Sequence, residues 1–237
     1  MPNKAWIAIC VRQDAWRFRE IGMYEPSHFK VEDRAQLHGV IRQHPLATLV
    51  TVGEGGLLAN PVPFVLHADE GENGVLRAHL ARPNAQWKAI AAGAETLVIF
   101  TGVERYVTPA WYATKQEHGK VVPTWNYVTV QVRGPARAIE DPVWLHAQLQ
   151  SLTQQQEAPR AEPWAITDAP APFIAAQARG IVGIEVEIAS ILGKFKLSQN
   201  RREDDKLGVL NGLSADPESE SQAMAALVKQ HGFGGNA

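Results

Sequence analysis

Cationic and amide side chains gather at a point where an apolar, strand-like run gives way to a helix-like one. Residues 77–88 read RAHLARPNAQWK, and His79, Arg82, Asn84 and Lys88 lie within this stretch. A helix start presents unpaired backbone N–H groups and the positive end of a dipole, so it stabilises an anion such as phosphate. The alternative is that Asn84 only caps the helix while the cations are solvated. This stretch alone leaves both interpretations open.

A second segment of the same kind spans residues 193–201, GKFKLSQNR. Lys194 and Lys196 are two apart and are expected on one face of a strand. Ser198 is predicted to cap a following helix whose first turn holds Gln199, Asn200 and Arg201. A cation at a helix start opposes the dipole, so a bound anion would explain Arg201, as would the downstream acidic residues EDD.

Aromatic residues accompany these cations in the segment PTWNY, residues 123–127. Trp125 and Tyr127 offer flat apolar surfaces, and Asn126 offers amide hydrogen bonds. A phosphate site beside a flat ring surface is typical of a nucleotide-like cofactor, of which flavin mononucleotide (FMN) is the smallest common example. The alternative for the tryptophans is core packing.

The run GLLANPVPFVLH, residues 56–67, carries Pro61 and Pro63 two positions apart. Both missing N–H groups would lie along one side of a strand, which therefore cannot donate to a neighbouring strand. This indicates an edge strand, approached on that side either by solvent or by a cofactor.

Composition narrows the class of protein. The chain has 237 residues, 45% of them hydrophobic and 20% charged, with a formal net charge of −2. This is typical of a globular protein with no overall attraction to nucleic acid. No apolar run approaches the roughly 18 residues of a membrane helix. Cys10 is the one cysteine, which favours a reducing, cytoplasmic setting. Residues 1–22 lack a signal-peptide pattern and are expected to be an N-terminal extension.

The standard catalytic and metal-binding patterns are absent: we find no GxSxG, HExxH, Walker or GxGxxG motif. The eight histidines are scattered, so no metal site is predicted. Hydrophobic patterning predicts strands at 46–52, 57–67, 74–80, 96–102, 126–139 and 181–190, and a long ordered loop at 107–127. Helices are predicted at 33–43, 84–92, 141–153 and 171–179. Because turns join the early strands, the fold class is predicted as mainly β with peripheral helices (α+β), an antiparallel barrel.

Several motifs, in order, resemble the PaiB-type family of FMN-binding negative transcriptional regulators: MYEPSHF, PLATLVT, GLLANPVPF, LRAHLARPNAQWK, GKVVPTWNY, IVGIEVEI and GKFKLSQNR. The resemblance runs from about Met23 to Leu213. It implies an FMN-binding split β-barrel domain over 23–213, with a tail helix over 214–237. It also implies a homodimer with FMN at the subunit interface.

The resemblance assigns site residues by position. Beside the flavin ring it places Asn60, Pro61, Val62 and Pro63, and around the phosphate His79, Ala81, Arg82, Asn84 and Lys88. From the later motifs, contributed across the dimer, come Trp125, Asn126, Lys196, Gln199, Asn200 and Arg201. Related oxidases usually carry Ser-Arg-Lys where this chain has Asn84-Ala85-Gln86.

Two classes of function follow from the resemblance: a flavin-dependent oxidoreductase acting on an unidentified small molecule, or a flavin-linked negative transcriptional regulator. One alternative is a DNA-contacting repressor without catalysis, although the sequence shows no helix-turn-helix and is slightly acidic. Another is a haem-binding split barrel with a histidine such as His79 as ligand. No side chain is assigned as catalytic acid or base.

Overall fold

A computed structural model describes residues 22–233. The expected extension at 1–22 lies, except for Gly22, outside the described residues. Among residues 22–233, no helix has the length and apolar character needed to cross a membrane.

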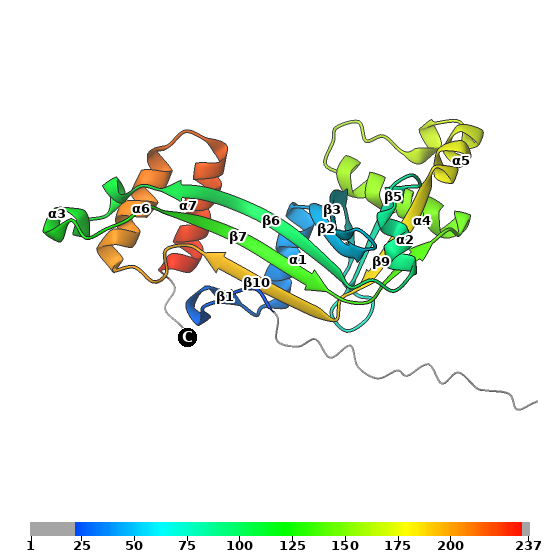
Figure 1. The fold of residues 1–237 in the computed structure, drawn as a ribbon. Helices are drawn as coiled ribbons and strands as arrows, with labels where there is room; N and C mark the ends of the chain where they lie inside the picture. The colour runs from blue at the N-terminus through cyan, green and yellow to red at the C-terminus, as the bar shows by residue number, and fades with distance from the viewer. Residues whose placement is uncertain (1–21, 234–237) are drawn as a thin grey trace, which may run out of the picture.

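The chain forms two antiparallel sheets (Figure 1). The six-stranded sheet has the order β1 (Lys30–Val31), β10 (Ser190–Lys196), β7 (Thr124–Arg133), β6 (Thr96–Val107), β2 (Leu46–Gly53), β3 (Gly56–Pro63). The four-stranded sheet has the order β4 (Val65–His67), β5 (Val75–Ala81), β9 (Ile181–Glu187), β8 (Ala136–Ile139).

Helices lie around the sheets, which confirms the predicted class of β protein with peripheral helices. They are α1 (Arg34–Gln43), α2 (Gln86–Ala91), α3 (Thr114–His118), α4 (Pro142–Glu157), α5 (Ala171–Arg179), α6 (Glu203–Ala215) and α7 (Ser219–Gly232). Short 3-10 turns span η1 (Ser27–Phe29), η2 (Pro109–Trp111) and η3 (Ile166–Asp168). Asp33 and Asp141 accept backbone N–H bonds at the starts of α1 and α4, as their positions before those helices predict.

The core lies between the inner faces of the two sheets. Alternate strand residues supply it, among them Leu49, Val98 and Val130 from one sheet and Leu76 and Ile184 from the other, all fully buried. Burying these side chains supplies the main driving force for closing the sheets on each other. The outer face of the six-stranded sheet therefore does not contribute to this core.

Two predicted strands are each divided between the sheets. The run 57–67 breaks at Phe64 into β3 and β4, and the run 126–139 breaks at Gly134-Pro135 into β7 and β8. A Cβ on Gly134 would lie 1.7 Å from the carbonyl oxygen of Glu187, so only glycine fits this crossing. The chain thus changes sheet at Gly134, inside the run predicted as one strand. These divisions add two strands to the predicted ones, and the described residues also hold β1 and a β10 separate from β9, which makes ten.

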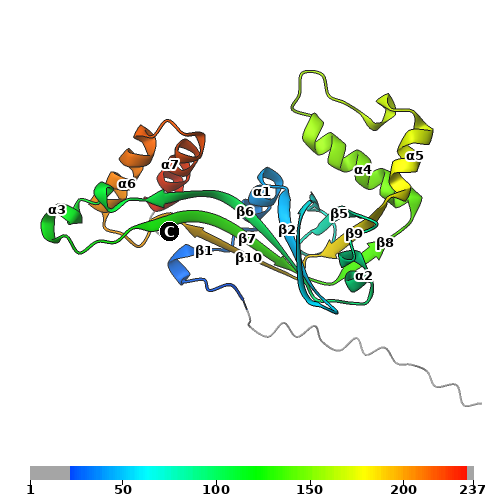
Figure 2. The same ribbon diagram turned by 45° about the horizontal axis from the view of Figure 1, so that its top comes forward.

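The central hairpin is longer than predicted. β6 continues to Val107, and the predicted loop 107–127 contains η2, α3 and the start of β7. Figure 2 shows β6, β7 and β10 extending beyond the barrel, with α6 and α7 at their far end. The charged tail segment forms α7, while α6 spans the expected domain boundary at Leu213.

Candidate cofactor site

Strand β3 forms an edge of the six-stranded sheet, as its prolines predict. Phe64 N donates to Pro45 O at 2.8 Å, so the backbone N–H of Phe64 faces the side of β2. Because successive strand residues face alternate sides, the nitrogens of Pro61 and Pro63 point to the open edge. Val62 is buried, whereas Pro61 is exposed and Pro63 half-buried.

The first cation-rich turn, between β5 and α2, is closed by an amide network. Asn60 Nδ2 donates to Gln86 Oε1 at 2.9 Å, and Gln86 Nε2 donates to Leu49 O at 2.9 Å. Gln86 is completely buried. The network fastens the start of α2 to β2 and β3. Gln86 was not among the predicted site residues. A polar residue beside the apolar face of the predicted helix was the one feature of the sequence that could have indicated its buried role.

Arg82 also has internal partners. Its Nε donates to Arg179 O at 2.9 Å, its Nη2 to Ile181 O at 3.2 Å, and its Nη1 to Glu140 at 2.5 Å. These bonds attach the end of β5 to the start of β9. A phosphate at Arg82 would have to compete with a carboxylate and two carbonyls, so the phosphate role of Arg82 stays a prediction.

The other residues of this turn point in different directions. Asn84 Oδ1 accepts the backbone N–H of Gln86, as a cap does. Lys88 is exposed and lies over the Trp87 ring, and Ala81 is exposed. His79 pairs with Gly183 in β9 on the face where Trp144 of α4 packs. Burial lowers the pKa of His79, which favours a neutral ring.

The second cation-rich turn differs from its prediction. Ser198 does not cap a helix: its φ is +67°, and Arg201 N donates to Ser198 O in a tight turn. Helix α6 begins only at Glu203, after Arg202, with acidic residues in its first turn. Arg201 therefore precedes the helix, and the supposed conflict with the dipole was wrong.

Lys194, Lys196 and Arg201 form what we call the cationic cluster. Lys194 and Lys196 share the Tyr127 ring, at 5.3 and 5.9 Å from its centroid, while Arg201 lies 4.8 Å from the Tyr112 centroid. Among residues 22–233, no carboxylate lies within ion-pair distance of the three cations. Burial, and then repulsion by Lys194 and Arg201, lowers the pKa of Lys196. The cluster thus holds concentrated positive charge.

Flat aromatic surface adjoins the cluster, as predicted. Tyr127 pairs with Lys196 across β7 and β10, and Trp125 is on the same strand face, 49% exposed. Lys196 Nζ donates to Trp125 O at 2.8 Å, which places the ammonium beside this surface.

Three further predicted residues belong to the turn at the cluster. Asn126 is fully buried on the opposite face of β7, and its Oδ1 accepts the Ser198 hydroxyl at 3.1 Å. Gln199 bonds the backbone of Leu197 and Phe195. Both side chains therefore hold the turn that presents the cations. Asn200 is exposed.

Within one chain the two cation-rich turns are far apart. α2 precedes the start of β6, whereas Lys196 pairs with Tyr127, which pairs with Glu104 near the other end of β6. The eight residue steps along β6 from Thr96 to Glu104 span roughly 25 Å. Figure 1 shows α2 beside the four-stranded sheet and α6 at the far end of β6 and β7.

The two sheets, the open β3 edge and the basic, aromatic sheet end define a flavin-type split β-barrel. The chain matches a family model described as "Putative FMN-binding domain" over residues 23–190, and it belongs to that family. This membership confirms the resemblance and the expectation of FMN as cofactor.

The chain is also similar to other proteins in sequence and to solved structures in fold. An uncharacterised Emericella nidulans protein is 34% identical over 231 residues, covering 83% of this chain and 92% of its own. The Bacillus subtilis protease synthase and sporulation protein PAI 2 is 28% identical, covering 87% and 97%. The fold is similar to that of an FAD- and haem-binding protein from Mycobacterium smegmatis (19% identity, 70% and 73% covered, TM-score 0.53). It is also similar to that of the flavocytochrome Anf3 from Azotobacter vinelandii (15%, 76% and 75%, TM-score 0.52).

The residues present fit FMN by their chemistry. The cationic cluster supplies charged donors that suit a phosphate, and Trp125 and Tyr127 supply flat surface that suits an isoalloxazine ring.

Proposed function

We propose that this protein is a homodimeric FMN-binding flavoprotein in which the cationic cluster binds the FMN phosphate. The observation that carries the proposal is the set of three cations without a carboxylate partner among residues 22–233. An anion there would relieve the repulsion between them. Charge-assisted hydrogen bonds to phosphate are also about twice as strong as neutral ones.

The ring side of the site is proposed to come from a second copy of the chain. By register, the side chains of Thr48, Pro61 and Lys194 lie on the same outer face of the six-stranded sheet. This face exposes Leu46, Val52 and Leu57, which are 64, 54 and 77% exposed. A two-fold axis through the face would place the β3 end of one chain against the cationic cluster of its partner.

A variant on that face tests the coupling between dimer and cofactor. Leu57→Lys puts a charge into the proposed interface, so we expect a monomer by sedimentation and a large loss of FMN affinity. Leu207→Lys, at an exposed leucine of α6, is the matched control. A monomeric wild-type protein that binds FMN would contradict the dimeric site.

When bound, FMN supplies electron and hydride transfer to a small molecule. The chain's own side chains hold the phosphate through Lys194, Lys196 and Arg201 and orient the ring against Trp125 and the β3 backbone. We infer a flavin-dependent oxidoreductase activity in the cytoplasm. Any effect of the protein on transcription would then be an indirect result of this activity. Absorption and mass spectra of ligand released from protein purified without added cofactor test the flavin directly; a Soret band would instead favour the haem alternative.

Direct DNA binding is the competing use of the same cations. It predicts a promoter-fragment mobility shift that weakens as salt rises, because phosphate contacts release counterions. Under our proposal FMN saturates the cluster, so added FMN would abolish any such shift. A salt-dependent shift that persists with FMN bound would favour the repressor.

A further inference from the structure

Helix α5 has an apolar face that the other residues of the described range 22–233 bury only in part. Ala171, Ile174, Ala175 and Ala178 follow the spacing i, i+3, i+4 and i+7, which places them on one side of the helix. No residue of α5 is buried. An amphipathic helix normally packs such a face against the core, so this face is available for another contact.

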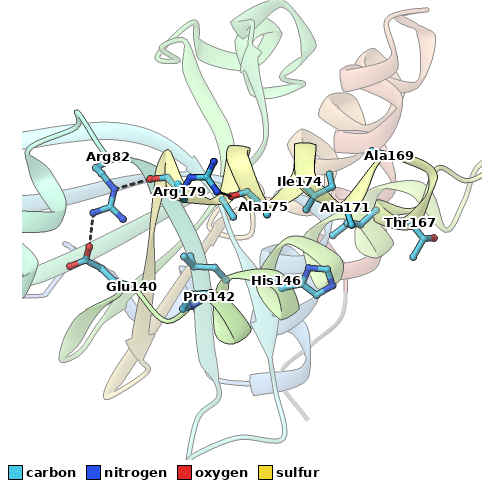
Figure 3. Close-up of a pocket in the computed structure, with 13 residues that line it drawn as sticks. Arg82, Glu140, Pro142, His146, Thr167, Ala169, Ala171, Ile174, Ala175 and Arg179 are labelled. Atoms are coloured by element: carbon cyan, nitrogen blue, oxygen red, sulfur yellow. Dashed lines mark hydrogen bonds and ion pairs between the residues drawn. The ribbon is translucent and has the colours of Figure 1, made fainter.

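The face lines a pocket between α4 and α5 with a volume of about 840 Å³ (Figure 3). Leu145 and Ile166, both buried, contribute to its walls together with Pro142 and Ala169. Pockets for small molecules are commonly about 300–1,000 Å³ and mostly apolar. The size and lining therefore suit a small organic molecule with an apolar body.

Charged groups border the pocket where α5 ends. Arg82 and Glu140 pair with each other, which cancels their charges. Asp141, next along the chain, accepts the backbone N–H groups of Val143 and Trp144 as the cap of α4.

Arg179 is the exception at this border. Its Nη1 donates to Ala175 O at 3.3 Å, and no carboxylate of residues 22–233 forms an ion pair with it. Figure 3 shows Arg179 at the Arg82 end and His146 and Thr167 toward the other. An exposed guanidinium without a carboxylate partner among residues 22–233 thus lies at one end of an apolar pocket.

We propose that this pocket binds a small organic acid, with its apolar body along α5 and its carboxylate on Arg179. The pocket lies on the helical side of the four-stranded sheet, whereas the cationic cluster lies at the far end of the six-stranded sheet, so this is a second site beyond the proposed function. The pairing of an apolar cavity with one guanidinium selects a monocarboxylate over an alcohol or an amine of the same length.

Octanoate, octan-1-ol and octylammonium, titrated by calorimetry into FMN-loaded protein, test the site. We expect saturable binding in the order octanoate, octanol, octylammonium. Arg179→Gln should weaken octanoate about tenfold and leave octanol unchanged, because one charge-assisted bond is removed. Ala175→Trp should fill the pocket and abolish binding of both. Phe173→Ala, at an exposed α5 residue outside the pocket lining, is the matched control.

Three outcomes would overturn the proposal: no saturable octanoate binding, octylammonium binding as tightly as octanoate, or loss of octanoate binding in Phe173→Ala equal to that in Ala175→Trp. FMN affinity is measured on the same samples. If FMN binding fails while Ala175→Trp still abolishes octanoate binding, the proposed function falls and the acid site stands. Competition between FMN and octanoate would show that they share one site, and would overturn the proposal of a separate acid site at α5.

Discussion

The two cation-rich turns look alike in sequence and differ in structure. At the β5–α2 turn, Arg82 has a carboxylate and two carbonyl partners, and Gln86 closes a buried amide network with Asn60. At the turn after β10, Lys194, Lys196 and Arg201 crowd around tyrosine rings without a carboxylate partner in the described part of the chain.

The difference separates two uses of the same residue types. Where a carboxylate of the fold neutralises a cation, as Glu140 does for Arg82, the cation stabilises the fold. Where burial and like charges lower the pKa of a lysine, its charged form is disfavoured, and a bound anion would offset the repulsion between the charges. α2 is also only six residues long, so its dipole adds little to an anion site at the first turn. We therefore expect substitutions at the first turn to affect stability and those at the second to affect FMN affinity.

The largest effect is expected for Gln86→Leu. The change leaves Asn60 and two backbone carbonyls without their partner in a buried place, so the free energy of unfolding should fall by about 2–4 kcal/mol. Chemical denaturation measures this, with Gln116→Leu on exposed α3 as the control. An unchanged unfolding midpoint would show that the amide network does not hold the turn.

The next effect is a pH dependence at the second turn. The pKa of Lys196 is lowered, so in the ligand-free protein Lys196 loses its proton at a lower pH than an ordinary lysine. FMN phosphate favours the protonated form. The FMN-to-riboflavin affinity ratio should therefore fall as the pH rises above neutrality, and the fall should begin at a lower pH than an ordinary lysine would give.

The control for this dependence is Lys196→Arg, which keeps its charge over the whole range. We expect its affinity ratio to stay level. A ratio that falls equally in Lys196→Arg would assign the dependence to another group.

Arg82→Gln tests the same comparison at the first turn, between β5 and α2. The variant loses bonds to Arg179 O and Ile181 O and a largely exposed ion pair, so stability should fall by about 1 kcal/mol. FMN and riboflavin should weaken by the same factor. Selective loss of FMN would instead support the phosphate role that the sequence resemblance gives to Arg82.

The smallest effect is expected for Ser198→Ala. It removes the hydroxyl that Asn126 Oδ1 accepts and leaves that oxygen buried without its partner, which should lower stability by about 0.5–1 kcal/mol. FMN affinity should fall a few-fold through a less fixed turn. If Ser198→Ala lowers stability but keeps full FMN affinity, the turn at Ser198 does not position the cationic cluster for FMN.

Local patterns predicted much of the fold. The prolines of β3 predicted an edge strand, and Asp33 and Asp141 predicted helix starts, because each depends on the chemistry of adjacent backbone. The sheet changes at Phe64 and Gly134 could not be read from the sequence, because the apolar run 62–66 and the alternation through Gly134 both resemble continuous strand, and only the closure of the barrel divides them.

The sequence predicted which residues form the candidate site better than it predicted the hydrogen-bond partners of those residues. Lys194, Lys196 and Tyr127 share a face as strand spacing requires. The turn at Ser198 was mispredicted because Ser-Gln-Asn resembles a helix start, whereas Asn126 from a distant strand holds a left-handed backbone there. The partners of Arg82 likewise come from residues about 58 and 97 positions away, which no local pattern indicates.

The most direct test compares one lysine from each turn. FMN and riboflavin affinities are measured by flavin fluorescence for wild type, Lys196→Gln and Lys88→Gln, since only FMN carries the phosphate. We predict that Lys196→Gln lowers the FMN-to-riboflavin affinity ratio by about 10- to 100-fold while Lys88→Gln leaves it unchanged. A ratio that collapses in Lys88→Gln and survives in Lys196→Gln would place the phosphate at the first turn and contradict the account.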